Sequence, residues 1–357
     1  MFYRQAGIRH TKYTHIARLF PIPADRWMTG ALLALALAAP FYLGPLYLNS
    51  YILPWLLWTA AALGLNLVVG WAGQMHLGYA AVMAVGAYSG VHCARAGLPW
   101  ELAMLVGGGA SVLVGSIFAF AALRTKGLYL ALTMLAMQFI MDWVLNHVPA
   151  ISGGSHAALQ SPAFALVGMP ITSTAGHYYV GLAWCVCVTV FLLNLKRTGL
   201  GRALVAVREK DYAAVVLGIN SFYFKQLAFA MSSFIAGVSG VLFVANFYLL
   251  VSPEQFSVNV SIQVLAMIIV GGLGSIIGTY FGTALILLSP SLINGSIAAI
   301  FRFAGLDLDS ETLAHLPNAV YGALIIVFLL IEPLGLGKLF ANVREYFLTW
   351  PFGYLRK

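Results

Sequence analysis

The sequence predicts an all-α integral membrane protein of about ten transmembrane helices, some of them short or broken. Of its 357 residues, 61% are hydrophobic and only 8% are charged, and long apolar runs recur along the whole chain. A soluble domain carries about 25% charged residues, so this composition cannot cover a water-exposed surface. It excludes a secreted enzyme, a nucleic-acid-binding module and a disordered scaffold.

Ten apolar runs approach the length of about 20 residues that a helix needs to cross a bilayer. They are residues 27–48, 52–70, 79–93, 102–122, 127–147, 178–195, 223–249, 260–273, 275–294 and 317–333. The runs at 79–93 and 260–273 are short, and each lies beside a glycine-rich helix break. The glycines of these two breaks are Gly70, Gly73, Gly271, Gly272 and Gly274. Irregular backbone at membrane depth needs a covering of protein or a water-filled cavity, so we expect the breaks near a translocation path.

The distribution of charge orients the spans. With ten spans both termini lie on one side, and the segments on that side, together with Lys225 at the inner end of its span, hold every Lys and Arg except Arg95 and Arg302. Because basic residues favour the cytoplasmic side, we expect an N-in, C-in topology. The chain then divides into a basic cytoplasmic arm (1–26), a transmembrane domain (27–333) and a cytoplasmic tail (334–357).

Two parts of the chain look alike. Residues 69–73 and 270–274 both read V-G-x-x-G, and a helix of small residues follows each. Weak internal repeats are common in transporters, whereas a match of five residues in a glycine-rich chain also arises by chance. Both interpretations stay open at this point.

The segment 196–222 is the long cytoplasmic connection, and it is rich in helix formers. Apolar and charged residues alternate along it, and Gly218 is a natural C-terminal stop for a helix. We expect one amphipathic helix over 202–218, which either docks another protein or lies on the inner leaflet. Its expected docking face comprises Leu204, Val207, Tyr212, Val215 and Val216, with Arg208 and Asp211 as polar anchors.

Residues 213–218, Ala-Ala-Val-Val-Leu-Gly, match the A-A-x-x-x-G part of the coupling-loop motif of ABC importer permeases; Tyr212 stands where that motif has Glu. The stretch 201–220 resembles the permeases of branched-chain amino-acid importers, and within them the LivM-type subunits. Further matching segments follow in family order: 65–88, 126–131, 152–155, 252–254 and 270–275. The resemblance covers roughly residues 60–335, which is most of the chain.

The resemblance implies a transport subunit of the bacterial inner membrane, not an enzyme. It implies a second homologous permease as heterodimer partner, two cytoplasmic ABC ATPases that bind ATP and Mg, a periplasmic solute-binding protein, and no nucleic acid. The chain itself would hold no cofactor and no metal, and no G-x-x-x-x-G-K-[ST] phosphate loop occurs in it. The residues implied in coupling to the ATPase are Arg202, Leu204, Val207, Arg208, Asp211, Tyr212, Ala213, Ala214 and Gly218. Branched-chain amino acids are the default cargo, with urea, amides and aromatic acids as alternatives.

Polar residues within spans are costly in lipid and are therefore candidates for the path. They are Asn66, Gln74, Gln138, Asp142, Asn246 and Gln263. Gln138 and Asp142 are four residues apart and share a helix face. Asp142 could line the path, reach the outer interface or pair with the partner permease. The outer loop 148–177 carries no Lys, Arg, Asp or Glu; with 250–260, it is the expected docking place for a binding protein.

Two other classes of function are an ion-coupled transporter and an intramembrane enzyme. A secondary transporter coupled to protons or sodium needs intramembrane ionisable groups, and only Asp142 and His76 are available. An intramembrane enzyme would show paired carboxylates, H-E-x-x-H or G-x-S-x-G, and none occurs. The three cysteines lie inside apolar runs and indicate no metal site.

Overall fold

The computed structural model describes residues 23–125, 127–154, 158–166, 168–288, 322, 326 and 335–349. These residues are mainly helical, which confirms the all-α part of the predicted fold class. Six of their helices are long and apolar enough to cross a membrane. They are Pro45–Trp71, Trp100–Ala122, Tyr129–His147, Thr174–Arg197, Ser221–Tyr248 and Pro253–Gly271. The expected span at 317–333, apart from residues 322 and 326, lies outside the described residues, as do the arm up to residue 22 and the end of the tail.

The first two spans divide earlier than the sequence predicts. Helix α2 (Pro23–Tyr42) ends before Gly44, whose backbone is extended, and Pro45 begins the next helix. Four pieces then follow without a break: α3 (Pro45–Tyr47), π-helical η1 (Leu48–Ile52), α4 (Leu53–Asn66) and π-helical η2 (Leu67–Trp71). The predicted boundary at 48–52 is wrong, because proline is favoured in the first turn of a helix and sets this start.

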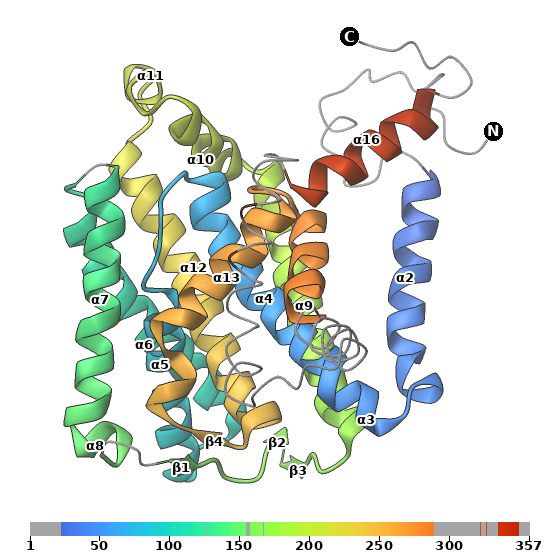
Figure 1. The fold of residues 1–357 in the computed structure, drawn as a ribbon, viewed down its shortest axis with the longest axis vertical. Helices are drawn as coiled ribbons and strands as arrows, with labels where there is room; N and C mark the ends of the chain where they lie inside the picture. The colour runs from blue at the N-terminus through green and yellow to red at the C-terminus, as the bar shows by residue number, and fades with distance from the viewer. Residues whose placement is uncertain are drawn as a thin grey trace, which may run out of the picture.

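Helix α4 lies at the centre of the molecule and is buried on nearly every side, as a helix that is apolar all round should be. Beside it, α5 (Tyr79–Arg95), α6 (Trp100–Ala122) and α12 (Ser221–Phe243) form a tightly packed group of three helices (Figure 1). A Cβ atom on Gly86 would run into the backbone of Gly237. The small residues that the sequence places in these helices therefore serve close helix packing.

Several helices begin at a polar cap. Ser173 Oγ accepts a hydrogen bond from the Gly176 amide at the start of α9 (Thr174–Arg197), and Asn220 Oδ1 accepts one from Tyr223 at the start of α12. Such caps satisfy backbone amides that the first turn leaves unpaired. The remaining helices at the outside of the bundle are α7 (Leu128–His147) and the short α8 (Pro149–Ser152).

The end of the molecule opposite α10 and α11 carries short strands (Figure 1). Strand β1 (Leu159–Gln160) pairs antiparallel with β4 (Leu250–Val251), and β2 (Ala165–Leu166) pairs with β3 (Met169–Pro170). β4 follows the π-helical end of α12, η3 (Val244–Tyr248), and precedes the 3-10 helix η4 (Pro253–Phe256). The segment 148–177 thus contains ordered structure and contacts the segment after α12.

The C-terminal part of the described chain begins with α13 (Val258–Gly271). Gly272 and Gly274 have φ angles of 107° and 84°, and they end α13 in a turn that leads to a helix over Ile276–Leu288. Helix α16 (Leu336–Thr349) lies within the expected tail and contacts α13. The two spans that the sequence predicts to be short, 79–93 and 260–273, correspond to α5 and α13, and the turn at Gly272 and Gly274 follows α13.

Candidate functional site

The connection after α9 folds as two helices, α10 (Gly199–Glu209) and α11 (Asp211–Val216), rather than the single helix predicted. Thr198 ends α9 and caps α10, its Oγ1 accepting from the Gly201 amide at 3.4 Å. Lys210 then takes an extended conformation, with φ −150° and ψ 91°, and separates the two helices. Gly218 has a φ of 85° and ends α11 as expected.

The two helices on either side of Lys210 differ in the exposure of their apolar residues. Leu204 and Val207 of α10 are 1% and 2% exposed, packed inside this chain. Our expectation that they form a docking face is therefore wrong, because α10 uses its apolar face to attach to the transmembrane helices. The apolar residues of α11 are exposed instead: Tyr212 by 84%, Val216 by 71% and the following Leu217 by 78%.

Arg208 points from α10 toward the membrane helices. Its Nη1 donates a hydrogen bond to the carbonyl oxygen of Gly70, in the last turn of η2. A carbonyl near a helix C-terminus has no partner within the helix and attracts a cation. Arg208 Cγ also lies 3.0 Å from where a Cβ of Gly73 would be. The Arg208 side chain thus joins α10 to the first glycine break.

The two glycine breaks meet at this point. Asn66 Oδ1 accepts from the Gly274 amide at 2.8 Å, and its Nδ2 donates to Thr279 Oγ1 at 2.8 Å and to the Ser275 carbonyl at 3.2 Å. Trp71 Nε1 donates to the Gly274 carbonyl at 3.0 Å. The two V-G-x-x-G motifs therefore form one contact, which we call the glycine junction (residues 66–74 and 271–279).

The junction leaves no room for a side chain at Gly70. A Cβ atom there would lie 2.8 Å from the Gly274 Cα and closer still to the Gly274 nitrogen. We predict that Gly70→Ala forces the two breaks apart, at about 1–3 kcal/mol, and lowers the thermal midpoint of the purified chain. Gly109→Ala in α6 is the matched control, because nothing lies within 4 Å of a Cβ there. Equal midpoints for the two variants would contradict this packing.

α11 is tied to α12 by an ion pair. Lys225 Nζ lies 2.7 Å from Asp211 Oδ2, and the Ser221 hydroxyl donates to Asp211 Oδ1. Arg202 of α10, also expected to act in coupling, donates to the Arg197 carbonyl at 3.1 Å, so its side chain reaches back to the end of α9. Ala214 is buried, while Ala213 is exposed beside Tyr212.

Gln138 holds the N-terminus of α5 in place. Its Oε1 accepts from the Ala81 amide at 2.8 Å and from Ser261 Oγ at 3.2 Å. Its Nε2 donates to the Phe256 carbonyl at 2.8 Å and to Asp142 Oδ1 at 3.0 Å. Every donor and acceptor of this amide is thus used to join α5, α7, η4 and α13. Asp142 is attached to the same network and is half-buried.

The other polar candidates lie apart from one another. Asn66 belongs to the glycine junction, and Gln74 donates to the nearby Ala72 carbonyl. Asn246 faces His177 at the strand end, with 2.8 Å between Oδ1 and Nδ1. Gln263 is half-buried in α13. The sequence did not single out Ser261, Ser275 or Thr279, although Ser275 and Thr279 are four residues apart in a helix of small residues.

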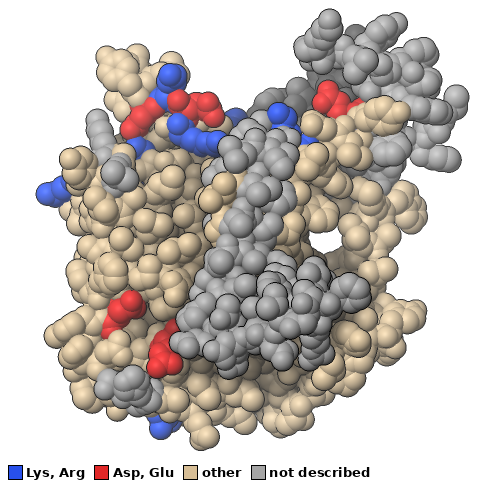
Figure 2. Space-filling model, viewed as in Figure 1, with Lys and Arg blue, Asp and Glu red and all other residues tan. Residues whose placement is uncertain are grey.

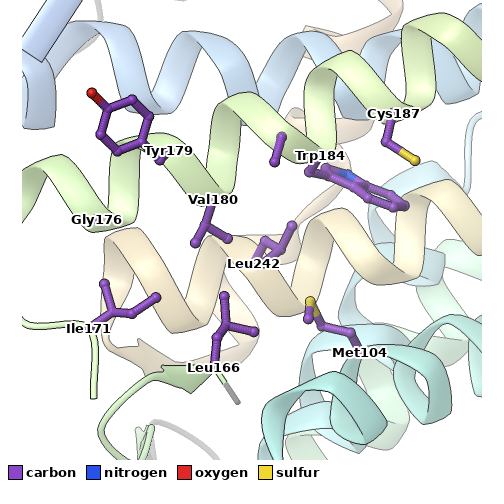
Figure 3. A pocket seen from close by; sticks show the side chains of 10 residues that line it. Met104, Leu166, Ile171, Gly176, Tyr179, Val180, Trp184, Cys187 and Leu242 are labelled. Atoms are coloured by element: carbon purple, nitrogen blue, oxygen red, sulfur yellow. The ribbon is translucent and has the colours of Figure 1, made fainter. Parts of the chain in front are cut away.

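A groove of about 520 Å³ lies between α6, α9 and α12 (Figure 3). Its lining is apolar and includes Met104, Val180, Trp184 and Leu242. Such a surface offers no hydrogen-bonding partners to a small polar solute. Among the described residues no group of three His, Cys, Asp or Glu could hold a metal ion.

Comparison with known proteins decides what kind of protein carries this site. A model of the family "branched-chain amino acid transport system / permease component" matches residues 47–329. The chain is 32% identical, over 73% of its own length and 67% of the relative's, to the high-affinity branched-chain amino acid transport system permease protein LivM of Escherichia coli. The chain belongs to the branched-chain amino acid permease family. The resemblance identified in the sequence is thereby confirmed.

A more distant relative is the fructose import permease protein FruG of Bifidobacterium longum, 21% identical over 73% of this chain and 75% of the relative. A solved structure, PsaBC from Streptococcus pneumoniae in complex with Fab, aligns with 87% of this chain and 99% of its own at a TM-score of 0.43 and 10% identity. That similarity is too low to support an argument. As a LivM-type permease, this chain is a transport subunit of an ABC importer, a multi-pass inner-membrane protein and not an enzyme.

Proposed function

We propose that this chain forms, with a second homologous permease, the membrane path for branched-chain amino acids. The names of the LivM relatives support this cargo. The name of the more distant FruG relative specifies fructose instead, and urea, amides and aromatic acids stay as alternatives. Selectivity then lies mainly in a periplasmic binding protein that delivers the solute, and the permease needs only a tolerant path.

The orientation we propose places α10 and α11 in the cytoplasm, with ten spans and both termini on that side. Figure 2 shows Lys and Arg side chains, together with Asp and Glu, gathered along the edge that carries α10 and α11, above a mainly uncharged surface with a few charged side chains toward the opposite end. The described basic residues of that edge include Lys196, Arg197 and Lys210. An excess of basic residues at one end of the spans supports a cytoplasmic location for that end.

The proposed mechanism begins at the exposed face of α11. Two cytoplasmic ATPases bind ATP and Mg, and one of them docks on Tyr212, Val216 and Leu217. α11 follows α10 after the single residue Lys210 and contacts it, so movement of α11 carries α10 with it. The Arg208 hydrogen bond then moves the glycine junction, and the Asp211–Lys225 pair moves the start of α12. The periplasmic protein would dock at the opposite end, where β1 and β4 join the two outer loops.

The observation that carries this proposal is that the apolar face of α10 is buried in this chain, whereas the apolar residues of α11 are exposed. A short helix with large exposed apolar residues stands on a second helix that is fixed to the membrane domain. Exposed apolar patches of this kind mark protein interaction sites. An ion-coupled transporter would have no use for such a face.

The test is purification of this chain from its own membranes in mild detergent, followed by reconstitution. We expect two ATPases and a second permease to co-purify, and leucine uptake to require ATP and the binding protein. A chain that purifies alone and transports without ATP would contradict the proposal and direct attention to Asp142 as an ion site.

A further inference from the structure

Helix α16 has an apolar stripe that the described residues leave exposed. Its apolar residues recur at helical spacing, and Leu339 and Val343 are 45% and 53% exposed. Lys338 and Asn342 are also exposed, about 100° around the helix from Leu339 and Val343. Apolar side chains are more stable when they are removed from water, so we expect this stripe to be covered.

The start of α16 is fixed to the glycine junction. A Cβ on Gly337 would lie 2.7 Å from Ser275 Cβ and 3.2 Å from the Gly271 carbonyl oxygen, and Gly335 packs as closely on Gly272. Gly335 has a φ of 73°, which directs the chain into the helix. One turn later Phe340 contacts the ring of Phe281, with 6.1 Å between centroids. The helix is therefore held at the end of two membrane helices.

The position of α16 relative to the membrane helices indicates what its apolar stripe contacts. Figure 1 shows α16 running obliquely away from the end of the bundle, on the side away from α11 and over the end of α2. α2 begins at that end, where Trp27 is 81% exposed. Tryptophan is enriched where a span meets the headgroups. The start of α16 therefore lies at the level where α2 begins.

We propose that α16 is an interfacial helix that lies on the lipid surface, with Leu339 and Val343 among the acyl chains and Lys338 near anionic headgroups. Helices with an apolar face and basic residues on the other bind in this way. The bilayer surface then holds Gly335 and Gly337 against the turn 271–278. Lipid contact at α16 is thus part of what positions the glycine junction. This proposal depends neither on the cargo nor on the docking of an ATPase.

The experiment uses the full chain, with its three cysteines replaced, in nanodiscs of phosphatidylethanolamine and phosphatidylglycerol. A fluorescent nitrobenzoxadiazole label is attached at Val343→Cys and, as the matched control, at Asn342→Cys. We expect spin-labelled lipid to quench the label at 343 several-fold more than the label at 342, and aqueous iodide to quench them in the reverse order. Leu339→Cys should repeat the result for 343.

Two outcomes would overturn the proposal. Equal quenching by lipid at 342 and 343 would show that the stripe does not lie in the membrane. A label at 343 that neither lipid nor iodide quenches would show that protein covers it, either another copy of this chain or a partner subunit. Both positions are exposed, so the substitutions should leave the fold intact.

Discussion

Arg208→Met is expected to leave the importer assembled and its ATPases active while uptake falls by about tenfold. Methionine keeps the apolar stem but donates no hydrogen bond to the Gly70 carbonyl. Loss of this hydrogen bond should cost about 1–2 kcal/mol. The value is modest because much of the Arg208 side chain is exposed. A change of about 1.4 kcal/mol corresponds to a factor of ten. The lost hydrogen bond joins α10 to the glycine junction, so ATP hydrolysis should continue while less solute is transported for each ATP.

The measurement is the number of solute molecules imported per ATP hydrolysed, in one preparation of proteoliposomes. Arg202→Met is the matched control on the same helix, since Arg202 bonds to the Arg197 carbonyl, outside the junction. It should keep the ratio of the unmodified chain, and Arg208→Lys should recover part of it. Uptake and ATP hydrolysis that fall in proportion would assign Arg208 a structural role only.

Val216→Asp is expected to abolish binding of the ATPase. Val216 is 71% exposed in α11, so the change should not disturb the fold of this chain. Within an interface, however, it would bury an unpaired carboxylate, which costs several kcal/mol. A loss of about 4 kcal/mol weakens binding about a thousandfold.

Binding is measured by co-purification and by titration of the ATPases onto the permeases in nanodiscs. Val216→Ile keeps the position apolar and serves as the matched control, with near-normal binding expected. Normal binding to the Val216→Asp protein would show that the ATPase docks elsewhere, and the assignment of α11 would then fail.

Much of the fold follows from composition and periodicity. The apolar runs predict the membrane helices, and Gly218 predicts the end of α11 because a left-handed residue there suits glycine. The boundary between the first two spans was misplaced, since Gly44 and Pro45 lie inside a run that is apolar throughout. Hydropathy cannot detect a break of this kind.

The sequence predicts the site less completely. A helical pattern shows that Leu204 and Val207 form an apolar face, yet it does not say whether this chain or a partner covers that face. Lys210 carries no recognisable helix-breaking signal, so the division into α10 and α11 was missed. The two V-G-x-x-G motifs were visible, whereas their mutual contact depends on Asn66 and on packing between segments about 200 residues apart. Contacts of this range are a property of the tertiary structure.

The central claim is that movement of α11 reaches the glycine junction through Arg208. It is tested most directly by spin-label distances from Leu113 in α6 to Val216 and to Ile277, measured without nucleotide and with ATP bound. All three side chains are exposed. We predict that both distances change with ATP, and that Arg208→Met abolishes the change at Ile277 while leaving the change at Val216. A distance to Ile277 that stays constant while the distance to Val216 changes in the unmodified chain would contradict the account.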